Sequence, residues 1–182
     1  MFTKKPAPIK LLAHFFTVVI LITCLSCEDD NIFKQLVDPP AKVLPPATQT
    51  GANTFGCKVN GKVWLPSETA WMEFREGGIS LVAKNKLTPQ QTVIINIGKY
   101  VINGVGTYNI SKLTPYYSNG YFRNESKHFE TDDTNTGTII ITRLDTTKFN
   151  YIVSGTFNFK ARDEITGETV EVTEGRFDLR KQ

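Results

Sequence analysis

Histidine and cysteine, the usual metal ligands and catalytic partners, are scarce in this chain, which has two histidines and three cysteines in 182 residues. Beyond residue 27 only His128 and Cys57 remain, so a zinc site lacks its usual ligands. A Ser-His-Asp triad would have to use His128, and no Gly-x-Ser-x-Gly turn is present to hold a serine nucleophile. A glycine-rich phosphate loop ahead of a helix is also missing. We therefore expect no enzymatic activity, no catalytic residues, no metal and no cofactor.

The chain beyond residue 26 also has no excess of charge of either sign. The formal net charge is +3, but residues 1–26 hold three lysines and no carboxylate. The remaining chain has 18 basic residues (21 − 3) and 18 acidic residues, a net charge of zero. Because nucleic-acid binding depends on a basic surface, this balance argues against a nucleic-acid partner.

No apolar run reaches the roughly 20 residues that a comfortable membrane span needs. The run at residues 11–22 is interrupted only by His14 and Thr17, and three lysines precede it. A basic start, a short apolar run and a small residue before the cleavage site of the signal peptidase are typical of a secretory signal. We therefore predict a signal peptide at residues 1–26, with an uncleaved membrane anchor as the alternative.

The end of this signal, Cys24-Leu25-Ser26-Cys27, resembles the lipobox of bacterial lipoproteins. In that motif the signal peptidase cuts after a small residue, here Ser26, and before a cysteine that carries diacylglycerol. The motif prefers leucine three residues ahead of the cysteine, and Cys24 departs from that. The resemblance implies a lipid anchor at Cys27, and the several acyl chains of such an anchor give lasting membrane attachment.

A second cysteine competes for this role. Cys24 has Leu21 three residues before it, but the cut would then follow the β-branched Thr23. We prefer Cys27 because the polar, acidic chain begins directly after it.

Three carboxylates, Glu28, Asp29 and Asp30, follow the predicted anchor. They resemble the acidic export tag of Bacteroidota surface lipoproteins; the alternative is a solvated charge run in a flexible tether. We expect a lipid-anchored protein of the outer membrane, exposed at the cell surface, with the periplasmic face as the alternative location.

The rest of the chain divides into an acidic, proline-rich tether at residues 27–53 and a domain at residues 54–182. Pro39-Pro40 and Pro45-Pro46 fix extended backbone in the tether. From residue 54 onward, short alternating stretches are separated by turn residues such as Asn60-Gly61, which is typical of a tight hairpin. No long 3.6-residue repeat occurs. We predict an all-β fold, a single antiparallel β-sandwich or barrel-like domain of about 8–10 strands.

The last predicted strand, residues 169–180, changes parity. Val170 and Val172 are even-numbered, whereas Phe177 and Leu179 are odd-numbered, so a regular strand cannot place all four on one face. One extra residue repairs the register, and we predict a bulge at Glu174-Gly175 with the glycine at positive φ.

The polar stretch at residues 124–135 is predicted to be loop. Its end, residues 132–137, offers oxygen ligands but lacks the spacing and distal glutamate of a calcium hand, so we interpret it as a turn. Asp145-Thr146-Thr147 resembles the O-glycosylation motif of exported Bacteroidota proteins, which implies Thr146 as a modification site, with a plain turn as the alternative. We interpret Cys57 as a small buried hydrophobe.

Aromatic residues make up 11% of the chain. They include Trp64, Trp71, Tyr116, Tyr117 and Tyr121. We expect most of the aromatic residues to pack in the core or between strands. Two or three of them exposed together would form a platform on which sugars stack.

Two stretches carry a wider resemblance. The first runs from Leu44 through Cys57 to Val59-Asn60-Gly61-Lys62-Val63-Trp64; the second comprises residues 155–159 and 175–178. They resemble a Bacteroidota lipoprotein family whose β-rich domain has no assigned function. The resemblance implies no catalytic residue.

The sequence therefore predicts a non-enzymatic binding or structural accessory module, held on the membrane by its lipid and binding an unidentified glycan or protein. A β-barrel carrier of a small apolar ligand is the alternative, which an interior cavity of several hundred Å³ would favour. A glycan or peptide hydrolase is the least favoured, because it would need paired carboxylates facing each other across a cleft.

Overall fold

The computed structural model describes residues 41–75, 78–87, 89–98, 102–112, 118–147 and 150–181. The predicted signal, the lipid-anchor cysteine and most of the tether lie outside these residues. Residues 42–182 form one compact unit, to which the description below applies. Among these described residues we find no helical segment with the length and hydrophobicity of a transmembrane span.

The described part of this unit is built from antiparallel strands. They are β1 (Thr54–Val59), β2 (Lys62–Trp64), β3 (Trp71–Arg75), β4 (Gly78–Asn85), β5 (Gln91–Ile97), β6 (Gly106–Ile110), β7 (Asn119–Arg123), β8 (His128–Glu130), β9 (Gly137–Thr147), β10 (Asn150–Asp163) and β11 (Thr169–Arg180).

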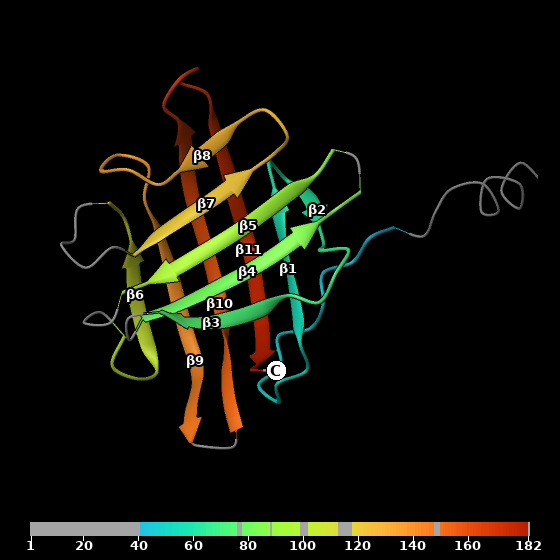
Figure 1. The fold of residues 1–182 in the computed structure, drawn as a ribbon, viewed down its shortest axis with the longest axis vertical. Coiled ribbons are helices and arrows are strands. Elements are labelled where there is room, and N and C mark those ends of the chain that lie inside the picture. The colour runs from blue at the N-terminus through green and yellow to red at the C-terminus, as the bar shows by residue number, and fades with distance from the viewer. Residues whose placement is uncertain are drawn as a thin grey trace, which may run out of the picture. The chain divides into compact units, whose positions relative to one another are not determined.

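The strands form one hydrogen-bonded path that folds into two layers. The path runs β2-β1-β11-β10-β8-β7-β5-β4-β3, and β9 and β6 branch from β10. Figure 1 shows β3, β4, β5 and β7 crossing in front of β1, β9, β10 and β11. The end of β10 joins the layers, since Arg162 and Asp163 pair with Glu130 and Phe129 of β8.

The predicted all-β, antiparallel, sandwich-like fold is confirmed. In the part of the chain that the structure describes, the sheet does not close into a barrel, and it has eleven strands where about 8–10 were predicted. The hairpin at Asn60-Gly61 is also confirmed: both residues have positive φ, 47° and 76°, as a two-residue turn of this kind requires.

Alternate residues of each strand point between the layers and form the core. Phe157 of β10 lies near its centre, with ring centroids 5.3 Å from Phe55 and 6.2 Å from Phe177. Cys57 is fully buried in the same cluster, and burial raises its pKa to about 12, so the thiol is protonated and unreactive. The interpretation of Cys57 as a buried hydrophobe is confirmed.

The bulge predicted in β11 is present. Phe157 pairs with Gly175 and Phe159 with Val172, so the single residue between them on β10 faces two residues on β11. The register against β1 shifts at the same place. The extra residue lets the even-numbered valines and the odd-numbered Phe177 and Leu179 all point into the core, where each is buried.

The predicted conformation of the bulge glycine is wrong. Positive φ falls on Glu174, at 49°, and not on Gly175. Gly175 is required for a different reason: a Cβ atom there would lie 2.5 Å from Cε2 and Cζ of Phe157. The aromatic ring therefore occupies the space that a side chain at residue 175 would need.

One strand was missed. The polar stretch that the sequence predicts as loop contains β8, which pairs with both β7 and β10. Phe129 is its one apolar residue, and its ring centroid lies 6.0 Å from that of Phe122 across the pair. A three-residue strand with a single core side chain is too short for an alternation pattern to reveal it.

Candidate functional site

Several predicted site residues lie outside the described part of the chain. These are the lipid-anchor cysteine Cys27 and the export-tag residues Glu28, Asp29 and Asp30. Their assignments remain predictions.

Thr146, the predicted O-glycosylation site, lies near the end of β9 and is exposed. It pairs with Tyr151 in the hairpin between β9 and β10. The neighbouring Asp145 carboxylate accepts hydrogen bonds from the backbone N–H and the hydroxyl of Thr147, at 3.1 and 2.8 Å. The side chain to be modified is therefore accessible, while its two neighbours hold each other in a turn.

The loop at residues 132–137, which was considered as a calcium site, is a turn stabilised by Asp132. Oδ1 of Asp132 accepts hydrogen bonds from the backbone N–H groups of Thr134 and Asn135, at 2.8 and 2.5 Å. Burial raises the pKa of Asp132, but these bonds outweigh burial and lower it to about 2. Among the described residues no group of three or more His, Cys, Asp or Glu side chains is placed to hold a metal ion.

The strongest polar site is one that the sequence did not reveal: the carboxylate of Asp178. Asp178 has no exposed surface, although it lies on the outer side of β11. Its oxygens accept hydrogen bonds from six donors at 2.6–3.3 Å: Thr48 Oγ1, Thr50 N, Thr50 Oγ1, Gly51 N, Ala52 N and Ser154 Oγ. Burial would raise the pKa of Asp178, but these bonds outweigh it and hold the pKa far below its ordinary value.

Five of the six donors belong to residues 48–52, which the sequence analysis assigned to the tether. We call residues 44–53 the N-terminal strap, because they cross the outer side of β1 and β11. Three arginines bind its backbone carbonyls: Arg176 binds Pro45, Arg143 binds Gln49 and Arg180 binds Thr50. Gly51 has φ of 73°, and a Cβ there would lie 2.9 Å from Nε of Arg180. The strap is thus fastened mainly through its backbone.

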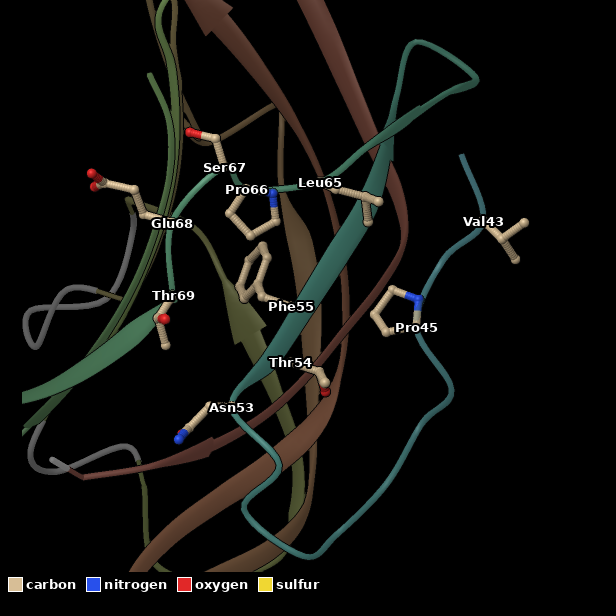
Figure 2. Close-up of a pocket in the computed structure, with 10 residues that line it drawn as sticks. All are labelled: Val43, Pro45, Asn53, Thr54, Phe55, Leu65, Pro66, Ser67, Glu68 and Thr69. Atoms are coloured by element: carbon tan, nitrogen blue, oxygen red, sulfur yellow. The ribbon is translucent and has the colours of Figure 1, made fainter. Parts of the chain in front are cut away.

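A pocket of about 540 Å³ opens beside the strap (Figure 2). Val43 and Pro45 line one side of it, Phe55 lies at the start of β1, and residues 65–69 line the other side. Pro66 cannot donate a backbone hydrogen bond, and β2 ends just before it, at Trp64. The chain then crosses to the other layer, where Ser67 N donates to Lys84 O at 3.0 Å. The pocket results from this crossing.

The front layer presents an ordered outer surface. Strand pairing aligns outward residues of β3, β4, β5, β7 and β8 into three rows, which together we call the β3–β8 face. The central row is Trp71, Val82, Ile94, Tyr121 and Glu130; one flanking row is Glu73, Ser80, Asn96 and Asn119; the other is Lys84, Thr92, Arg123 and His128.

Hydrogen bonds fix the aromatic residues of the central row. Trp71 Nε1 donates to Glu73 Oε1 at 2.9 Å. Asn119 Nδ2 donates to the Tyr121 hydroxyl at 2.5 Å and to Glu130 Oε1 at 3.1 Å. Burial and the neighbouring Glu130 charge raise the pKa of Tyr121 to about 12, so its hydroxyl stays protonated. Both rings are partly exposed and held in defined orientations.

His128 lies where the β3–β8 face meets a pocket of about 510 Å³, whose other wall is the turn after β10. Its ring centroid lies 5.2 Å from that of Tyr121, and its backbone N–H donates to Asp163 Oδ2 at 3.0 Å. Burial and the charge of Arg123 lower the pKa of His128, so the imidazole is neutral at pH 7. The contact with Asp163 uses the backbone and not the ring, unlike the histidine–carboxylate contact of a catalytic triad.

Comparison with known proteins gives a family but no function. A family model described as Domain of unknown function (DUF6252) matches residues 52–178. The chain belongs to this family. No curated protein and no solved structure matches it. The DUF6252 match begins at Ala52 and ends at Asp178, the two residues joined by one of the hydrogen bonds of the strap.

The DUF6252 domain of this chain therefore has two surfaces of chemical interest. One is the outer side of β1, β10 and β11, which the N-terminal strap already occupies. The other is the β3–β8 face with its adjoining pocket, where partly exposed aromatic, amide and charged side chains are arranged in rows.

Proposed function

We propose that this protein is a lipid-anchored lipoprotein of the outer membrane, displayed at the cell surface, whose sandwich is a non-enzymatic binding or structural accessory module. The observation that carries the proposal is the sequence Cys24-Leu25-Ser26-Cys27, placed between a short apolar run and three carboxylates. It resembles the lipoprotein signal closely enough to name the acylated residue, Cys27.

The fastening of the N-terminal strap supports this proposal. A domain held to a membrane by its N-terminal end needs a firm junction between tether and fold. Here the strap makes five hydrogen bonds to Asp178, and three arginines bind its carbonyls. This arrangement would transmit a pull on the tether to the C-terminal part of β11, at residues 176–180.

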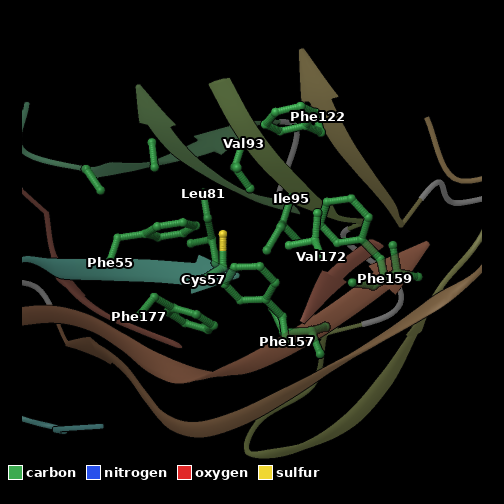
Figure 3. Packing of buried hydrophobic residues seen from close by; sticks show 14 of the residues in the cluster. Phe55, Cys57, Leu81, Val93, Ile95, Phe122, Phe157, Phe159, Val172 and Phe177 are labelled. Atoms are coloured by element: carbon green, nitrogen blue, oxygen red, sulfur yellow. The ribbon is translucent and has the colours of Figure 1, made fainter. Parts of the chain in front are cut away.

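The interior supports an accessory module over a carrier. Figure 3 shows phenylalanine, leucine, isoleucine and valine side chains from both layers meeting in the space between them. A carrier would need a cavity of several hundred Å³ at this place. Among the described residues this space is filled by buried side chains, and the two pockets described above lie beside the strap and beside His128.

A hydrolase remains the least favoured function. Four carboxylates line the same pocket, those of Glu125, Glu130, Asp163 and Glu164, and each already accepts a hydrogen bond. Glu125 accepts one from Gln90 N and Glu164 accepts one from Lys112 Nζ. Glu130 accepts one from Asn119, and Asp163 accepts others from the backbone of His128, Ile165 and Thr166. Such fixed carboxylates are typical of structural turns and networks.

The anchor can be tested by fractionating cells that express the Cys27→Ala and Cys24→Ala variants. We expect Cys27→Ala to release the protein from the membrane fraction, because no lipid can then be attached at that residue. Cys24→Ala is the matched control and should remain membrane-bound. Release of the Cys24 variant alone would show that the anchor is the other cysteine, and retention of both variants would contradict the assignment of Cys27 as the sole anchor.

A further inference from the structure

We propose that the β3–β8 face binds an uncharged glycan chain that lies across the strands and stacks on Trp71 and Tyr121. This inference rests on the proposed binding function and adds to it a location and a class of ligand.

The dimensions of the central row suit an extended chain. Trp71 is on β3 and Tyr121 on β7, with β4 and β5 between them. Neighbouring strands lie about 4.8 Å apart, so the two aromatic residues stand about 14 Å apart along the row. Val82 and Ile94 lie between them and give the middle of the row an apolar floor. A chain of several sugar rings could touch both aromatic residues at once.

The chemistry of the three rows matches the two kinds of surface on a sugar. The C–H side of a sugar ring is apolar and packs on aromatic rings, whereas its hydroxyls need both donors and acceptors. The flanking rows supply the amide of Asn96, the carboxylate of Glu73 and the cationic side chains of Lys84 and Arg123, and the central row ends at the carboxylate of Glu130. Asn96 Nδ2 donates to Oδ1 of the buried Asn119 at 2.8 Å, so the Asn96 amide is held in place before a ligand arrives.

The charge of the face selects among ligand classes. Within the three rows Glu73 and Glu130 balance Lys84 and Arg123, and His128 is neutral, so the rows carry no net charge; Arg162, which pairs with Glu130, adds one positive charge at their end. Such balance disfavours nucleic acid, which needs a basic surface. A lipid surface would need a larger exposed apolar patch, since Val82 is only 7% exposed. A peptide added as a strand would pair with a sheet edge and not with this face.

Two cations currently lie over the aromatic rings. Lys84 Nζ is 5.1 Å from the centroid of Trp71, and Arg123 Cζ is 5.9 Å from that of Tyr121. Both side chains are long and flexible, and no carboxylate among the described residues forms an ion pair with either. A sugar ring could therefore displace them from the rings, and they would then donate hydrogen bonds to its hydroxyls.

The fluorescence of the protein's own tryptophans can be used to measure this binding. It contains two tryptophans, and Trp64 is only 6% exposed, so quenching of tryptophan fluorescence by acrylamide reports chiefly on Trp71. The mature protein, purified in a detergent without sugar groups, would be titrated with cellohexaose, maltohexaose, mannohexaose and xylohexaose. We expect at least one of these to reduce quenching and to bind in calorimetry.

Variants locate the site. Trp71→Ala and Tyr121→Ala should each weaken binding by about tenfold or more, whereas Tyr121→Phe, which keeps the ring, should bind nearly as wild type does. Ile140→Ala is the matched control, because Ile140 is 42% exposed on β9 of the other layer. Thermal unfolding of each variant shows whether a loss of binding is only a loss of fold. Quenching of the wild-type protein measures binding without any substitution.

Two results would overturn the inference. One is that none of the four hexasaccharides binds the wild-type protein. The other is that binding occurs but is unchanged in Trp71→Ala and Tyr121→Ala. Neither result affects the lipid anchor, which cell fractionation tests separately.

Discussion

Asp178 is a buried carboxylate whose partners lie far away in sequence. Its donors on the N-terminal strap are 126 to 130 positions away, so no local motif marks the residue as special. Sequence patterns predict the burial of apolar side chains. They predict that a charged residue on the outward side of a strand is exposed to solvent. That is why the sequence did not predict this site, although it predicted the strand that carries it.

We predict that Asp178→Asn destabilises the domain by on the order of 3 kcal/mol. In one amide orientation the NH₂ group would face Thr50 N and Ala52 N, and in the other it would face Gly51 N. At least one backbone N–H loses its acceptor in either case. Urea unfolding of the mature protein measures the effect, with Asp133→Asn in an exposed loop as the control.

The effect should depend on pH. Because the folded pKa of Asp178 lies below its ordinary value of 3.8, the folded state binds fewer protons than the unfolded state. Its stabilisation is therefore complete well above pH 3.8 and declines as the pH falls toward the folded pKa. The stability difference between wild type and Asp178→Asn should shrink over that acid range. A difference that stays constant with pH would show that the carboxylate charge is not what fastens the strap.

At the scale of elements, β11 shows what a periodic pattern can and cannot predict. The parity change between Val172 and Phe177 located the bulge, because an apolar side chain on the wrong face would cost burial. The pattern could not tell which bulge residue takes positive φ, since that depends on what each residue faces. Glu174 points outward and pairs with Lys58, whereas Gly175 lies under Phe157.

We predict that Gly175→Val destabilises the domain by about 1–3 kcal/mol, as overpacking of a tight core contact does. The new Cβ would overlap the Phe157 ring, which has little room to move among Phe55 and Phe177. Glu171→Val, an outward and exposed change on the same strand, is the matched control. Equal urea midpoints for the two variants would mean that the contact between Phe157 and residue 175 is not tight in solution.

At the scale of the whole molecule, the sequence predicted the fold class but not the choice between sandwich and barrel. Alternating strands fit both arrangements equally well. The choice depends on long-range pairing, above all on β10, which pairs with β9, β11 and β8. The rows of the β3–β8 face depend on pairing in the same way, so Trp71 and Tyr121 could be named as aromatic residues but not placed together.

The acidic run behind the predicted anchor gives a test of location. We predict that replacing Glu28, Asp29 and Asp30 by alanine leaves the protein lipidated but facing the periplasm. Protease treatment of intact cells should then digest the wild type and spare the variant. Replacing the exposed Asp133, Glu164 and Glu171 by alanine instead removes three carboxylates from the domain without altering the run, and this control should be digested as the wild type is. Equal digestion of wild type and the alanine variant of the run would mean that the run is only part of the tether.

Lipid at Cys27 is what we propose holds the domain on a membrane, and the mass of the mature N-terminal peptide decides whether it does. We expect a peptide that begins at Cys27, lacks residues 1–26 and carries the added mass of diacylglycerol and a further acyl chain. A lipid on Cys24, or an N-terminal peptide that keeps the signal and carries no lipid, would contradict it.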